Sequence, residues 1–221
     1  MKIRILALSL LSFLGAEIAF AAIDLVMLRD SSDDQPAFGT VDFSYLRKDP
    51  RKKTDHNGNI KLPPPAHDKA DPIEVCPDNQ TKYGSCFRQQ FPKDDGLIWL
   101  LTRSGAIQLE RRAEELGQQE KFKPAAALTA IAGDFYKELD QTKSQALLIK
   151  ALGFLARNYD MKPFAGVSVT PEDQLRQAVL RDSGVAEKPA ALGAWDSQDF
   201  LYIAGQTRSE ALRSAGLATS R

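Results

Sequence analysis

Histidine and cysteine are scarce in this chain, and long apolar runs are missing. Its 221 residues include two histidines and two cysteines. The longest mostly apolar stretch, residues 5–15, is well short of the roughly 20 residues that cross a bilayer. Basic and acidic side chains balance at 29 each, so no net charge attracts the chain to nucleic acid or anionic lipid. We therefore expect no nucleic-acid partner and no stable insertion in a membrane.

The first 21 residues have the pattern of a secretory signal peptide. Lys2 and Arg4 give a positive start, an apolar stretch follows, and Ala19-Phe20-Ala21 offers the small residues that signal peptidase recognises. A membrane anchor is the alternative, for which the apolar stretch is short. We expect cleavage before Ala22 and a mature chain that is periplasmic or secreted, in a bacterium.

The two cysteines, Cys76 and Cys86, lie close together in the sequence. An even number of cysteines in an exported chain favours a disulfide. The Cys-x-x-Cys spacing of redox-active pairs is absent. The sequence therefore predicts a structural bridge at the junction of two regions that differ in composition.

These two regions predict a mainly α fold. Residues 22–75 are interpreted as an extended, Pro-rich N-terminal arm with one or two short β-strands, at 23–28 and 38–45. Within it, residues 47–71 contain few apolar side chains and a triple proline, which is typical of a linker or surface arm. Residues 76–221 are predicted to form a disulfide-stapled helical domain of five or six helices.

Several patterns indicate helices in that domain. Apolar residues at helical spacing predict a hairpin of two helices, 124–140 and 142–160. Thr170-Pro171 is typical of a helix start, and Asp196 is expected to cap a last helix. Residues 97–101 are wholly apolar, which fits either a buried strand or a helical turn. Apolar positions that continue at helical spacing favour the helix.

Few residues suit catalysis or metal binding. His56 and His67 lie in the polar arm without a third ligand at a recognisable spacing, so we interpret them as exposed loop residues. The helical region has no histidine, which argues against a Ser-His-Asp site there. Five carboxylates are available for a hydrolase-like pair: Glu110, Glu114, Glu115, Asp134 and Glu138. Glu110 and Glu114 neighbour Arg111 and Arg112, so we interpret them as a solvated charged helix face. We expect no catalytic residue, metal or cofactor.

These observations favour a non-catalytic accessory or structural component of a bacterial cell-envelope assembly, of the secretion or conjugation type. The expected partners are other envelope proteins. Val41, Phe43 and Tyr45 would contact them by strand addition, and Trp195 by docking. The alternative is a periplasmic carboxylate-based hydrolase acting on glycan or peptidoglycan, which requires two acids in one pocket, at least one with a raised pKa. A secreted effector or toxin is also compatible with export. The sequence does not fix the oligomeric state.

Overall fold

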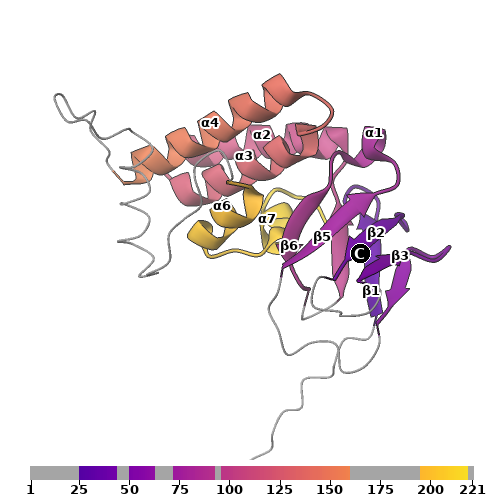
Figure 1. Cartoon of the computed structure of the whole chain (residues 1–221). Helices are drawn as coiled ribbons and strands as arrows, with labels where there is room; N and C mark the ends of the chain where they lie inside the picture. Colours follow the sequence, from indigo (N-terminus) through magenta and orange to yellow (C-terminus); the bar gives the residue numbers. More distant parts are fainter. Residues whose placement is uncertain (1–24, 44–49, 63–71, 93–95, 160–194, 219–221) are drawn as a thin grey trace, which may run out of the picture.

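The structure, a computed structural model, describes residues 25–43, 50–62, 72–92, 96–159 and 195–218. It contains 48% helix and 22% strand, with two sheets of three and four strands. The strands lie in the N-terminal half of the chain and the helices in the C-terminal half (Figure 1). The fold is therefore mixed α/β, and the prediction of a mainly α fold with one or two strands is wrong.

The three-stranded sheet has the order β4-β1-β7, with strands β4 (Asn59–Lys61), β1 (Leu25–Asp30) and β7 (Leu97–Leu100). Strand β1 is antiparallel to β4 and parallel to β7. The helix favoured at 97–101 is thus wrong, and the strand alternative holds. Strand β7 is apolar throughout because Ile98 and Trp99 are buried on opposite sides of it, in two different cores.

The four-stranded sheet has the order β3-β2-β5-β6 and is antiparallel throughout. Its strands are β3 (Arg51–Lys53), β2 (Gly39–Asp42), β5 (Pro72–Pro77) and β6 (Phe87–Gln90). Strands β3 and β4 fall in residues 47–71, so the linker interpretation is wrong for the part of this segment that is described, 50–62. Residues 44–49 and 63–71 lie outside the described residues.

Two apolar cores result from this arrangement. The β-core contains the buried residues of both sheets, including Val26, Val41 and Phe87. The helical core contains the buried faces of the helices, including Leu128, Leu155 and Phe200. Strand β7 supplies side chains to both, and it leads directly into the first long helix.

A short helix, α1 (Gln80–Tyr83), lies between β5 and β6. The helical core is built from α2 (Arg103–Gln118), α3 (Phe122–Tyr136), α4 (Gln141–Asn158), α6 (Ser197–Ala204) and α7 (Arg208–Ser214). Helix α3 packs against α2, α4, α6 and α7, and nearly all of its residues are buried. It is the centre of the helical half.

The sequence-based helix predictions are confirmed in part. The hairpin predicted at 124–140 and 142–160 corresponds to α3 and α4, and Asp196 is the N-cap of α6. The last helix is split into α6 and α7 at Gly205, whose φ of 64° suits glycine. The helix expected at Thr170-Pro171 lies outside the described residues.

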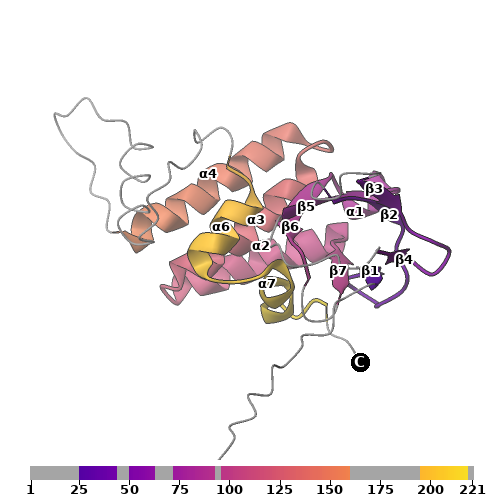
Figure 2. The same ribbon diagram turned by 60° about the horizontal axis from the view of Figure 1, so that its bottom comes forward.

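Helix α7 and the residues after it return toward the strands (Figure 2). The Gln108 side chain of α2 donates a hydrogen bond to the Ala215 carbonyl at 2.6 Å. The Ala218 amide donates to the carbonyl of Ser31, just after β1, at 3.0 Å. The end of the described chain is thereby attached to both halves of the molecule.

Candidate functional site

Three polar side chains from distant parts of the sequence meet where α3, α6 and α7 approach β6. Asp134 lies near the end of α3, whereas Ser197 begins α6 and Arg208 begins α7. The Ser197 hydroxyl donates a hydrogen bond to Oδ2 of Asp134. The Arg208 guanidinium lies over the Phe87 ring, with Cζ 3.9 Å from the ring centroid. We call Asp134, Ser197 and Arg208 the acid–arginine cluster.

Burial shifts both titratable groups of this cluster toward their neutral forms. Burial raises the pKa of Asp134 to about 6, although the Ser197 hydrogen bond and the charge of Arg208 oppose the shift. Burial also lowers the pKa of Arg208 to about 10, against the attraction of Asp134. Nε and Nη1 of Arg208 are buried and have no hydrogen-bond partner among the described residues. Asp134 therefore titrates in the range that suits a general acid or base.

Two more carboxylates lie at the start of α6. Asp196 accepts a hydrogen bond from the Gln198 amide at 2.9 Å, and Asp199 accepts one from the Asp196 amide at 3.0 Å. Together they form a capping box, which satisfies free amides of the first helical turn. Partial burial raises the pKa of Asp199, and the charge of Asp196 acts in the same direction. The pKa is thus raised for two acids close to Ser197, Asp134 and Asp199.

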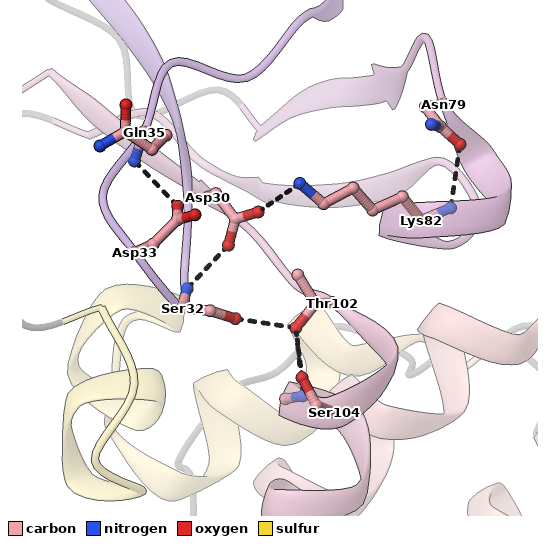
Figure 3. Close-up of polar contacts among 9 residues, drawn as sticks. Asp30, Ser32, Asp33, Gln35, Asn79, Lys82, Thr102 and Ser104 are labelled. Carbon is pink, nitrogen blue, oxygen red and sulfur yellow. Dashed lines mark hydrogen bonds and ion pairs between the residues drawn. The ribbon is translucent and has the colours of Figure 1, made fainter.

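A second polar cluster lies at the carboxyl end of β1 (Figure 3). The buried Asp30 carboxylate accepts hydrogen bonds from Lys82 Nζ of α1 at 2.9 Å and from the Ser32 amide at 2.8 Å. Burial acts to raise the pKa of Asp30, but these hydrogen bonds outweigh it, so the pKa lies below its ordinary value. The ion pair attaches α1 to the three-stranded sheet.

The same cluster reaches the start of α2 through hydroxyl groups (Figure 3). The Ser32 and Thr102 hydroxyls are 2.9 Å apart, and Thr102 Oγ1 accepts from the Gly105 amide at 3.2 Å as the N-cap of α2. The carboxyl ends of parallel strands are where α/β sheets bind ligands. Here, however, the polar groups are paired with one another, so the arrangement indicates a structural joint.

Cys76 and Cys86 form the predicted disulfide. It closes the segment 77–85, which contains α1, directly beyond the last pair of β5 and β6, Val75 opposite Phe87. Both cysteines are partly exposed. The bridge therefore closes the connection between β5 and β6 at its base.

Three of the four residues expected to contact a partner are buried inside the chain. Val41 and Phe43 are fully buried in the β-core, and Trp195 is buried in the helical core. The Trp195 ring packs edge-to-face on Phe200, with centroids 5.3 Å apart. These three side chains contribute to the interior of the chain. Tyr45 lies outside the described residues.

The other acids considered in the sequence form a charged surface, as interpreted. Glu110 pairs with Lys143 at 2.8 Å, Glu114 with Lys150, and Glu115 with Arg112 at 2.7 Å. The Glu138 side chain is exposed. Asp134 differs from them in its raised pKa. Its position in the sequence carries no signal that separates it from the others.

Among the described residues, no group of three or more His, Cys, Asp or Glu side chains is placed to hold a metal ion. His56 is exposed and its ring contacts Asn57, whereas His67 lies outside the described residues. Within the described ranges, none of the helices combines the length and the apolar character that crossing a membrane requires.

Comparison with known proteins gives no match: no family model, curated protein or solved structure corresponds significantly to this chain. The function is therefore argued from the residues and their geometry.

Proposed function

We propose that the chain is an exported, non-catalytic protein that acts as an accessory or structural component of a bacterial cell-envelope assembly, of the secretion or conjugation type. The Cys76–Cys86 disulfide is the main support, because structural disulfides persist in oxidising compartments outside the cytoplasm. The signal-peptide pattern of residues 1–21 supports the same location. Other envelope proteins are the partners in this proposal.

The observed pairing of the strands changes how a partner would be contacted. Strands β1 and β2 already pair within the chain, so they are not free to extend another sheet. The edge strand β3 is charged and exposed, and Arg51 and Lys53 pair with Asp42 and Asp78 at 3.1 and 3.2 Å. A charged edge resists strand addition. Strand addition at the β3 edge is therefore disfavoured.

Crosslinking in the intact envelope, followed by purification under denaturing conditions, tests this function. We expect one or a few discrete crosslinked proteins that are recovered in constant proportion. The control is the same chain crosslinked after it is released from the envelope and diluted, where these species should vanish. Recovery of the chain as a monomer without crosslinked partners, from intact envelopes, would contradict the proposal.

The acid–arginine cluster favours a second candidate, a periplasmic carboxylate-based hydrolase acting on glycan or peptidoglycan. Such enzymes pair a carboxylic acid of raised pKa with a second carboxylate. Asp134 has the raised pKa, and Asp196 and Asp199 lie near the same helix start. Against this role, the Ser197 hydroxyl occupies one Asp134 oxygen, and Ser197 and Arg208 are buried.

Asp134→Asn distinguishes the two candidates. A hydrolase would release reducing ends or muropeptides from purified peptidoglycan, and this variant would abolish the release with an unchanged circular dichroism spectrum. The Glu138→Gln variant changes an exposed residue just after the same helix; it is the matched control and should keep full activity. The non-catalytic proposal predicts no release by any of the three proteins.

A further inference from the structure

The disulfide-closed segment touches both halves of the molecule. We call residues 77–85 the bridge loop. On the side of the strands, its Lys82 donates to the buried Asp30 carboxylate at 2.9 Å, and its Tyr83 is buried in the β-core. The Asp30 pairing is not replaced by solvent, since this carboxylate is 3% exposed. Loss of the loop would leave a buried charge at the end of β1 without its partner.

On the side of the helices, the bridge loop contacts the end of α3. The Ser85 hydroxyl accepts a hydrogen bond from the Glu138 amide at 2.7 Å, and the Ser85 amide donates to the Phe135 carbonyl at 3.3 Å. Gly84, with φ of 79°, lies so close to Phe135 that an added Cβ would be 2.5 Å from its ring. These contacts need the loop backbone to follow one particular path.

The disulfide fixes that path. Strands β5 and β6 pair from Pro72 opposite Gln90 to Val75 opposite Phe87. The bridge joins the two strands just beyond the last pair. It therefore constrains the bridge loop, and with it the contacts that this loop makes with both cores. Because Cys76 and Cys86 are partly exposed, a thiolate reductant can reach the bridge in the folded protein.

We propose that the Cys76–Cys86 disulfide is a redox-sensitive coupling between the β-core and the helical core. A dithiol reductant supplies two electrons and two protons, the sulfur–sulfur bond becomes two thiols, and the reductant becomes a disulfide. Reduction removes the closure of a loop of about eleven residues, which makes loop opening about 100-fold more favourable on the chain-entropy model. Opening separates Lys82 from Asp30 and Ser85 from Glu138, so the cores lose a shared support.

The two cores respond differently to this loss. The helical core keeps the packing of α2, α4, α6 and α7 against α3. The β-core consists of strands of three to six residues, and its order depends more on the loop. Reduction therefore weakens one of the links between the two cores, and the β-core, which is the less stable, opens first. This inference does not depend on which proposed function is correct.

Pulsed hydrogen exchange with mass spectrometry along a urea series tests the coupling on the full chain. In the oxidised protein, we expect peptides from β1, β2 and β5 and peptides from α3 and α4 to lose protection at the same urea concentration. With dithiothreitol, and in the Cys76→Ser/Cys86→Ser variant, the strand peptides should lose protection first, while the α3 and α4 peptides keep their oxidised midpoint.

Two results would overturn the proposal. In one, all peptides of the reduced protein shift together to a lower midpoint, which means that the bridge acts only on the unfolded chain. In the other, no midpoint changes on reduction. Thr81→Ala is the matched control, because Thr81 is an exposed loop residue; its oxidised form should keep the shared transition.

Discussion

Replacing Asp134 by Asn should stabilise the protein at neutral pH and leave its stability at low pH unchanged. Burial raises the pKa of this carboxyl from 3.8 to about 6 in the folded chain. A raised pKa means that the folded protein favours the protonated acid, so ionisation of Asp134 opposes folding. Asn resembles the protonated acid in size and polarity, and it retains an oxygen that can accept from Ser197.

The size of the effect follows from the pKa. Each pKa unit corresponds to about 1.36 kcal/mol, so the shift from 3.8 to about 6 corresponds to about 3 kcal/mol. This contribution to stability is fully present below pH 3.8 and is lost as the pH rises through about 6. The attraction of Arg208 is already contained in the shift. The variant should therefore exceed the parent protein in free energy of unfolding by about 3 kcal/mol above pH 6, and equal it at low pH.

Urea unfolding of both proteins across this pH range measures the difference directly. Taking the difference cancels the titration of all other carboxylates. Glu138→Gln, an exposed change on the same segment, should give a nearly constant and small difference at every pH. If Asp134→Asn is instead less stable than the parent at neutral pH, the attraction between Asp134 and Arg208 outweighs burial, and the reasoning is refuted.

Three further substitutions test the backbone and capping arguments by urea unfolding followed with circular dichroism. Gly84→Ala should destabilise by roughly 2–4 kcal/mol, because of its positive φ and the contact with Phe135; a neutral effect would contradict the close packing of the loop. Gly153→Ala, with open space around its Cβ, should stabilise α4 by about 0.5–1 kcal/mol, and a loss would show that this face is covered. Thr102→Ala should cost about 1–2 kcal/mol through the lost α2 cap, and no loss would mean that the cap contributes nothing.

The helices were predictable because their signals are local. The apolar residues of helix α4 repeat at helical spacing. Asp196 and Asp199 form a capping box that the sequence shows directly. Such patterns depend only on residues three or four positions apart, so they can be recognised in the sequence without knowledge of the fold.

The sheets were not predictable in the same way. Strand β3 consists of Arg51, Lys52 and Lys53, which do not alternate in polarity because the strand lies at a sheet edge. Strand β7 is buried on both sides, so all of its residues are apolar. Its sequence therefore shows no hydrophobic periodicity that would distinguish a strand from a helix. Its partner β1 lies far away in the sequence. Pairing of this kind is decided by tertiary packing.

The candidate site was found only in part. Asp134 was among the acids considered, but Ser197 lies 63 positions away and was not considered. Arg208 follows the helix cap Thr207 and resembles any exposed basic residue of a first turn. Its burial against Phe87 arises because α7 folds back on β6. No local pattern encodes that contact.

Mass-spectrometric mapping of the protein from its native envelope, alkylated without reduction, tests the account most directly. We predict a single peptide pair linked through Cys76 and Cys86 and a mature chain that begins at Ala22. Two alkylated cysteines in a chain that still begins with Met1 would contradict the export, the bridge and the coupling of the two cores together.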